Sequence, residues 1–341
     1  MLIYTLRRLL AMIPVLLAAT IFSFLLVDIS GDPIAPLRVQ IPPVPETTIQ
    51  AETERLYQDR NTVERYWIWV VGYELPNGFG ANNGDAGLLR GRWGPSRTGL
   101  DIGGELRERF VITVRLVLAA TFLGFVLAII TGVVSAVRQY SKTDHALTFL
   151  GFLALAMPTF WLAALIKETG VWLNGQLGTR IFYTFGATSP GYERMTGLEK
   201  VGDVLGHLIL PTLALMLTGY AVISRFQRAS MLEVLNSDYV RLARSKGLRN
   251  RVVMRRHALR TALIPVVTLA ALSISGALTG VVITETIFQW RGLGTFLVSA
   301  IGEIDAFAVM GFLVLAGVLI VVMNLVADLL YAVLDPRIRY E

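Results

Sequence analysis

The stretch that decides the fold reads Leu116-Val-Leu-Ala-Ala-Thr-Phe-Leu-Gly-Phe-Val-Leu-Ala-Ile-Ile-Thr-Gly-Val-Val-Ser-Ala-Val137 and holds no charged side chain. Crossing the hydrocarbon core of a bilayer as a helix takes about 20 apolar residues. A helix is required because the bilayer offers no water to the backbone N–H and C=O groups. The stretch is therefore predicted to be a transmembrane helix.

Similar stretches recur along the chain. Five further segments also lack charged residues, namely 9–27, 146–166, 208–224, 261–284 and 306–327. The predicted fold class is therefore an all-α, polytopic membrane protein with six transmembrane helices. The segment 208–224 is the shortest, and we expect Pro211 in its first turn, where a helix tolerates proline.

Composition excludes several classes of protein. Of the 341 residues, 54% are hydrophobic and 16% are charged, whereas a soluble domain carries about 25% charged residues. The chain has no cysteine and three scattered histidines, which argues against thiolate, iron–sulfur and zinc sites. It also has no Gly-x-x-x-x-Gly-Lys-[Ser/Thr] phosphate cradle. The chain is therefore predicted to bind no nucleotide, cofactor or metal and to be no enzyme.

Basic residues predict the orientation of the spans, because Lys and Arg collect in short cytoplasmic loops. Arg7 and Arg8 precede the first span, and ten Lys and Arg residues lie within 225–260. Both termini are therefore expected in the cytoplasm. A cleaved signal peptide is the alternative for the first segment, but its apolar run is longer than usual and no small-x-small site follows. The arginines of 225–260 are not interleaved with aromatics, which argues against nucleic acid.

The predicted organisation has three parts. An N-terminal transmembrane helix at 1–29 is followed by an extracytoplasmic segment at 30–106, and a five-helix core fills 107–341. In the extracytoplasmic segment, 46–69 is predicted to be one helix because its apolar residues recur at helical spacing. The stretch 77–104 is rich in Gly and Asn, so turns are expected there. A second outer segment, 169–206, carries aromatic residues that favour anchoring at the membrane interface over contact with a substrate.

The inner loop at 225–262 is the most informative part of the chain. Residues 231–246 contain no Pro or Gly and precede Gly247, so a helix is predicted to end there. Its apolar face is expected to hold Leu232, Leu235, Tyr239, Leu242 and Ala243. Such a helix can lie on anionic lipid or insert into a groove on a cytoplasmic partner. The sequence pattern leaves both alternatives open.

Several motifs carry a family resemblance. In the inner loop they are Tyr239-Val-Arg-Leu-Ala-Arg-Ser-Lys-Gly247 and Arg256-His-Ala-Leu-Arg-Thr-Ala-Leu-Ile-Pro265. Elsewhere they are Gly31-Asp-Pro33, Met157-Pro-Thr-Phe-Trp161, His207-Leu-Ile-Leu-Pro211, Glu285-Thr-Ile-Phe-Gln-Trp-Arg-Gly-Leu-Gly294 and Leu334-Asp-Pro-Arg-Ile-Arg339. Together they resemble the permease subunits of ABC type I importers, in particular the first permease of dipeptide, oligopeptide and nickel importers (the DppB/OppB type). The inner loop is similar to that family's EAA loop.

The loop departs from the general family pattern at its first positions. Arg241, Leu242 and Ala243 stand where that pattern has Glu-Ala-Ala, and Pro265 comes later after Gly247 than the pattern has it. Both departures are similar to the peptide and nickel branch. The outer segment is elongated near 73–94, so the family's contacts there are not carried over.

The resemblance implies that this chain forms half of a peptide pathway in a bacterial or archaeal inner membrane. The implied partners are a homologous second permease, two ATP-binding subunits or domains that hold ATP and Mg, an extracytoplasmic substrate-binding protein, and membrane lipids. The positions implied to couple to the ATPase are Glu233, Tyr239, Arg241, Ala243, Lys246 and Gly247. Nickel chelates, glutathione and opine-like solutes stay open as substrates. An ATP-independent secondary transporter and a membrane scaffold are the alternatives from other classes.

A second group of residues is a candidate for the pathway or a gate. It consists of Pro158, Trp161, Ser273, Ser275 and Glu285. Each has a structural alternative: a proline kink without a gating role, close packing of small residues, or an interfacial carboxylate. In the last span, Asp328 is expected to pair with Arg7 or Arg8 near the inner headgroups rather than to act in transport.

Overall fold

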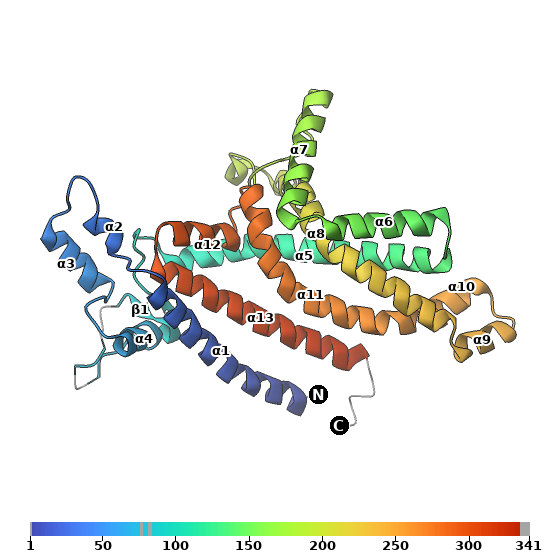
Figure 1. Cartoon of the computed structure of the whole chain (residues 1–341), viewed down its shortest axis with the longest axis horizontal. Helices are drawn as coiled ribbons and strands as arrows, with labels where there is room; N and C mark the ends of the chain where they lie inside the picture. Colours follow the sequence, from blue (N-terminus) through green and yellow to red (C-terminus); the bar gives the residue numbers. More distant parts are fainter. Residues whose placement is uncertain (1, 76–77, 81–83, 335–341) are drawn as a thin grey trace. The chain divides into compact units, whose positions relative to one another are not determined.

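The computed structural model describes residues 2–75, 78–80 and 84–334. In this part of the chain helices dominate, and a short hairpin of β1 (Ala86–Gly87) and β2 (Arg92–Trp93) is the only sheet (Figure 1). The chain divides into two compact units, which are described separately. Among the described residues, the N-terminal unit comprises 2–111 and 292–321, and the central unit comprises 112–291 and 322–334.

The described residues include four helices that are long and apolar enough to cross a membrane. They are α1 (Leu2–Ser30), α5 (Ile102–Val137), α8 (Gly197–Leu235) and Ala306–Val326 of α13. A fifth span results if the bent pair α6 (Lys142–Ala156) and α7 (Thr159–Leu177) is taken as one. The predicted all-helical membrane protein is thus confirmed, with four to five spans among the described residues.

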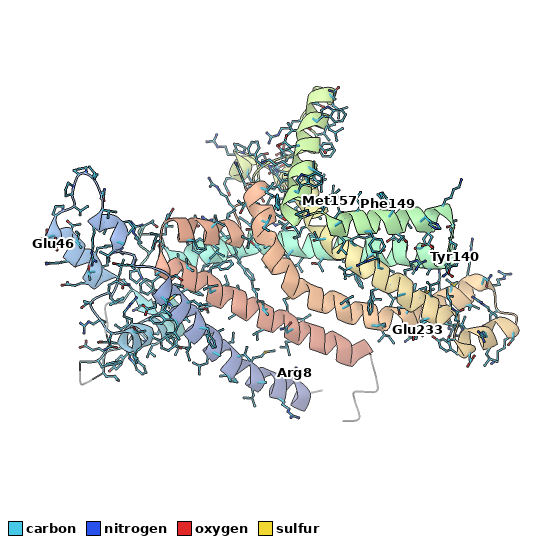
Figure 2. The ribbon with its side chains drawn as sticks, viewed as in Figure 1. Arg8, Glu46, Tyr140, Phe149, Met157 and Glu233 are labelled. Atoms are coloured by element: carbon cyan, nitrogen blue, oxygen red, sulfur yellow. The ribbon has the colours of Figure 1, made fainter. Side chains whose placement is uncertain are left out.

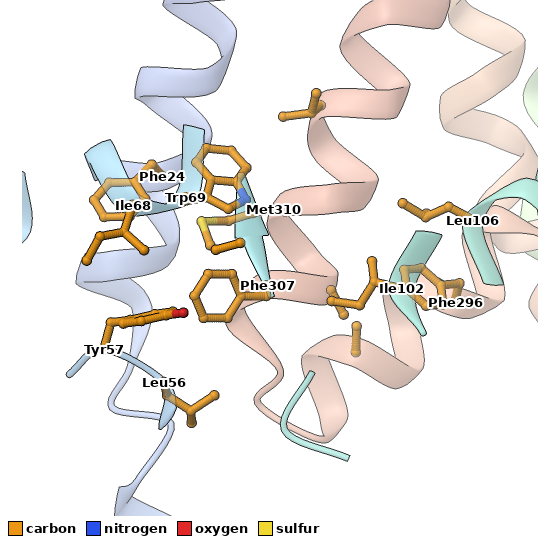
Figure 3. Close-up of a cluster of buried hydrophobic side chains, with 14 of the residues drawn as sticks. Phe24, Leu56, Tyr57, Ile68, Trp69, Ile102, Leu106, Phe296, Phe307 and Met310 are labelled. Carbon is orange, nitrogen blue, oxygen red and sulfur yellow. The ribbon is translucent and has the colours of Figure 1, made fainter. Parts of the chain in front are cut away.

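In the N-terminal unit, the segment predicted to be extracytoplasmic, called the outer segment below, packs on long apolar helices. The long helices of this unit are α1 (Leu2–Ser30) and the first part of α13 (Ala306–Leu334). The shorter ones are α2 (Ala35–Arg38), α3 (Glu46–Arg55), α4 (Thr62–Val70), η1 (Leu88–Arg90) and α12 (Leu293–Gly302). Phe24 of α1, Trp69 of α4 and Phe307 and Met310 of α13 share one buried cluster (Figure 3).

Polar contacts tie the outer segment of this unit to the turn before α13. The buried Asp305 accepts hydrogen bonds from Ser96 Oγ at 2.5 Å and from the backbone N–H of Arg97 at 2.9 Å. Arg55 donates to the carbonyl of Ser96 at 3.0 Å. Arg55 also hydrogen-bonds Glu52, which holds the pKa of that carboxyl below its usual value. The outer segment is therefore anchored by polar contacts as well as by its apolar core.

In the central unit, α8 (Gly197–Leu235) packs against α6, α7 and α11 (Leu259–Ile287) (Figure 1). The remaining elements are α5 (Ile102–Val137), which this unit shares from Ile112 onward, η2 (Tyr192–Arg194), α9 (Asp238–Ser245), α10 (Asn250–Val252) and the π-helix η3 (Val253–Ala258). At Gly132 of α5, an added Cβ would lie 2.7 Å from the carbonyl oxygen of Ser224. Glycine therefore lets α5 and α8 approach closely.

Several predicted helices have different bounds in the structure. The predicted span 146–166 is broken by a bend of 111° between α6 and α7, because Pro158 forces Met157 into an extended conformation. The helix predicted at 46–69 is two helices, since Asn61 caps a new one by accepting a bond from the Glu64 N–H.

Pro211 lies well inside α8 rather than in its first turn. The helix begins much earlier, at Gly197, because Thr196 and Glu199 form a capping box. The sequence pattern placed the start at the first residue of the charge-free run, whereas the polar residues before it are helical too.

Candidate functional site

The candidate site is centred on α9, the short helix of the inner loop. The helix predicted at 231–246 is interrupted, because α8 ends at Leu235 and α9 begins only at Asp238. Asn236 and Ser237 cause the break, since their side chains bond to nearby carbonyls, of Leu232 at 3.1 Å and of Val234 at 2.5 Å. The predicted stop is confirmed: Gly247 has φ +74°, the left-handed conformation that ends a helix.

One face of α9 is buried in the chain's own core. Val240 and Ala243 pack with Ala136 of α5, Met231 of α8 and Val253 of η3. Ala258 and Ala262 close the cluster from the side of α11. These contacts fix α9 on a platform built from four other helical elements of the central unit.

The opposite face of α9 carries exposed apolar side chains among positive charges. Tyr239 is 43% exposed and Leu242 is 55% exposed. The exposed polar and charged residues around them are Asp238, Arg241, Arg244, Ser245 and Lys246. The predicted single apolar face is divided: Ala243 is buried whereas Tyr239 and Leu242 are exposed, and the break at Asn236 and Ser237 leaves Leu232 and Leu235 on α8. A partner meeting this face would touch an apolar centre with a basic rim.

The predicted coupling residues are thus split by the structure. Tyr239, Arg241, Lys246 and Gly247 lie exposed on or just after α9. Glu233 is exposed near the end of α8 (Figure 2). Ala243 is buried and supports the helix from behind.

A groove of about 590 Å³ opens beside the platform. Apolar residues from α5, α8, η3 and α11 line it together with polar ones: Val133, Met231, Asn250, Arg251, Met254, Arg255 and Leu259. Its wall includes the π-helix η3, an unusual conformation often found at functional positions. Arg251 and Arg255 in this lining belong to the stretch 225–260, which is predicted to be a basic cytoplasmic loop.

Behind the platform lies an ion pair between a buried carboxylate and a partly buried arginine, which the sequence pattern did not predict. Asp144, in the first turn of α6, accepts two hydrogen bonds of 2.9 Å from the guanidinium of Arg228 in α8. The two residues are far apart in sequence, and each lies in a region whose charges were assigned to membrane topology. No local spacing could have indicated that they meet.

The candidate pathway residues lie at separate places. Pro158 is at the bend between α6 and α7, and Trp161 is exposed on α7. Glu285 in α11 is fully buried and accepts a bond of 2.5 Å from Thr113 Oγ1 of α5. Ser273 and Ser275 belong to α11, but their side chains lie outside the described residues, as does that of Asp328 in α13. Pro158 and Trp161 thus lie three residues apart at the start of α7, whereas Glu285 belongs to α11.

The described residues contain no group of three or more His, Cys, Asp or Glu side chains arranged to hold a metal ion. The candidate site on α9 combines exposed apolar side chains, surrounding basic residues and a packed face on the other side of the helix.

Comparisons with known proteins give a consistent family. Residues 117–340 match the family described as binding-protein-dependent transport system inner membrane component. The chain is 36% identical over 336 residues to the oligopeptide transport system permease protein OppB of Mycobacterium tuberculosis H37Rv, with 98% of each chain covered. It is 34% identical over 340 residues to the oligopeptide transport system permease protein AppB of Bacillus subtilis, with 99% of each covered.

Two further matches extend this picture. The dipeptide transport system permease protein DppB of Escherichia coli K12 is 34% identical over 355 residues, with 100% of each chain covered. Among solved structures, a chain of the MetNI methionine ABC transporter in an inward-facing conformation matches with a TM-score of 0.53 and 16% sequence identity. That match covers 67% of this chain and 96% of the other and concerns the fold alone.

Proposed function

This chain belongs to the binding-protein-dependent transport system inner membrane components, as a permease subunit of an ABC importer, and we propose that its cargo is di- or oligopeptides and that α9 couples it to an ATPase. The family resemblance read from the sequence is confirmed. The peptide cargo is supported by full-length relatives named as oligopeptide and dipeptide permeases. Nickel chelates and glutathione remain the alternative cargoes.

The single observation that carries the coupling proposal is the exposed face of α9. Tyr239 and Leu242 are exposed on α9, whereas Val240 and Ala243 on the other side of this helix are buried in the core. An amphipathic helix docked in an apolar groove is a common mode of protein recognition. Because the buried face of α9 packs against α5, α8 and α11, a partner bound to α9 acts on these helices.

The proposed assembly contains two permeases, two ATP-binding subunits or domains and an extracytoplasmic binding protein. ATP and Mg are bound by the ATP-binding partners, and this chain supplies half of the pathway. We propose six spans with both termini cytoplasmic, an N-terminal helix at 1–29, an outer segment at 30–106 and a core at 107–341. Pro158, Trp161, Ser273, Ser275 and Glu285 remain the proposed pathway or gate positions.

Co-purification of the ATP-binding partner tests this proposal. Tyr239→Ser and Leu242→Ser remove the exposed apolar centre, and Leu198→Ser at the outer start of α8 is a control at a leucine that is more exposed than Leu242. Truncating a central interface residue costs roughly 2 kcal/mol, so each α9 variant is expected to weaken capture about 30-fold. Peptide uptake should fall with capture, and the Leu198 variant should match the unmodified chain.

Two results would contradict the proposal. Capture that survives both α9 substitutions would exclude this face as the docking surface. Peptide uptake in membranes that lack every ATP-binding subunit would instead identify an autonomous secondary transporter.

A further inference from the structure

The buried carboxylate of Asp144 joins three separate parts of the central unit. It is 3% exposed and accepts hydrogen bonds from Ser135 Oγ in α5, from the backbone N–H of Tyr140 at 2.9 Å and from Arg228 in α8. The Arg228 contact is bidentate, with Nε and Nη2 each 2.9 Å from a different carboxylate oxygen. Arg228 Nε also lies 3.0 Å from Ser135 Oγ. Ends of α5, α6 and α8 therefore meet at one charged centre.

This charged centre lies directly behind the platform that supports α9. Ser135 is next to Ala136, and Arg228 is about one helical turn before Met231. Ala136 and Met231 are the residues of α5 and α8 that pack on Val240 and Ala243. A displacement of α9 that moves these apolar contacts therefore also strains the ion pair between Asp144 and Arg228.

The chemistry of the pair suits it to transmit displacement. Packed apolar side chains can slide past one another, because dispersion and the hydrophobic effect have no preferred direction. A bidentate guanidinium–carboxylate pair fixes both distance and orientation. A buried carboxylate that loses its partner also leaves an uncompensated charge, which is strongly destabilising. The ion pair therefore resists separation, whereas the apolar contacts between α9 and the platform can shift.

We propose that Asp144 and Arg228 are positioning residues for energy coupling: they lock the α5–α6 hairpin to the end of α8, so that a partner acting on α9 moves these helices as one body. This proposal rests on the proposed function of α9. It assigns a role in transport to two residues that contact neither cargo nor nucleotide. Without the pair, α9 moves against its platform and the ATP cycle no longer drives the spans.

The test uses the complete importer, with its ATP-binding subunits and binding protein, in proteoliposomes. The decisive variant is the double substitution Asp144→Asn with Arg228→Gln, which removes both charges and leaves no unpaired buried ion. Asp144→Asn and Arg228→Lys serve as single variants, the latter keeping the charge while losing the planar fork. The control is Arg109→Gln, because Arg109 pairs with Glu105 within one helix at 2.6 Å, and its second contact, over the Phe296 ring, also lies within the N-terminal unit.

The readouts are thermal stability, capture of the ATP-binding subunits, ATP hydrolysis and peptide taken up per ATP hydrolysed. For the double variant we expect the first three to stay near the unmodified values. Peptide per ATP should fall about 5- to 100-fold, the usual range of an energetic coupling between sites. Arg228→Lys should show a smaller fall in the same direction, and the Arg109 control should show none.

Contrary outcomes are clear-cut. A double variant with unchanged peptide per ATP would overturn the proposal and leave the pair as a structural brace. The same holds if stability, capture, hydrolysis and uptake all fall together, because a folding defect alone explains that pattern. If the single variants fail to fold, the double variant still decides. If the unmodified chain captures no ATP-binding subunit, the proposed function fails first, and that result is visible before any variant is compared.

Discussion

Gly132 illustrates how single residues set the spacing of the helices in the central unit. An added Cβ at this position would lie 2.7 Å from Ser224 O and 2.8 Å from Gln227 Cβ, whereas Gly219 in α8 has no neighbour within 4 Å. We expect Gly132→Ala to destabilise the detergent-solubilised chain by about 1–3 kcal/mol, the usual cost of overpacking. Gly219→Ala should be neutral or stabilising by up to about 1 kcal/mol, since alanine favours a helix.

Thermal unfolding of both variants measures the difference. Equal midpoints for Gly132→Ala and Gly219→Ala would show that α5 and α8 do not approach as closely as the structure places them.

Gly247 tests backbone conformation separately from space. Its φ is +74°, and an added Cβ would meet nothing within 4 Å. Gly247→Ala is therefore expected to cost about 1 kcal/mol through the left-handed backbone alone, and Gly247→Asn less, because asparagine tolerates that conformation better. Hydrogen exchange of the α9 amides should rise in the order Gly, Asn, Ala. Equal exchange in the three proteins would mean that the end of α9 does not depend on this residue.

At the residue scale, the sequence allowed some functional positions to be predicted and hid others. Gly247 was predictable because its role depends only on the local left-handed backbone conformation that ends the helix. The burial of Ala243 was not, because it depends on packing against Met231 and Val253 rather than on spacing within the helix. Asp144 and Arg228 were hidden because their meeting is purely a tertiary contact between helices distant in sequence.

At the scale of elements, α9 has one face that is buried in the core and one that is exposed. Substitutions on the two faces should therefore differ in their effect on stability. Val240 is fully buried, while Tyr239 beside it is 43% exposed. Val240→Asp buries an unpaired carboxylate, so we expect a loss of several kcal/mol of stability. Tyr239→Asp should change stability by less than about 0.5 kcal/mol, as for most surface positions. Thermal shift in detergent measures both, and a larger effect at Tyr239 would reverse the assignment of the two faces.

Apolar runs predicted where helices cross the membrane better than where the helices start and end. The charge-free run 116–137 lies wholly within α5, which begins at Ile102, because polar residues in a helix outside the bilayer leave no mark on an apolar run. The break at Met157 shows the opposite failure: one apolar run holds two helices bent by 111°, since Pro158 acts on the backbone and not on hydropathy.

At the scale of the whole molecule, the orientation in the membrane is open to direct measurement. The natural chain has no cysteine, so a single introduced cysteine reports one position. Tyr140, between α5 and α6, and Leu198, at the start of α8, are both exposed. In intact cells, a membrane-impermeant maleimide is expected to label Leu198→Cys, and Tyr140→Cys only after the membrane is opened. The reverse pattern would place the basic loops outside and refute the predicted topology.

Family membership could be predicted from the sequence because its motifs occur in order along nearly the whole chain. The division into two compact units could not, since the N-terminal unit combines residues 2–111 with the distant stretch 292–321. Contacts such as that of Asp305 with Ser96 create this unit, and no periodicity reports which distant segments pair.

The central claim, that the exposed face of α9 docks on an ATP-binding partner, is tested most directly by the reactivity of a cysteine placed on that face. In the full importer carrying Leu242→Cys, the rate of maleimide labelling should fall at least about tenfold relative to the permease alone, because a docked side chain is shielded from solvent. Leu198→Cys in the same assembly should label at an unchanged rate. Equal labelling of Leu242→Cys with and without the ATP-binding subunits, at every nucleotide condition, would contradict the account.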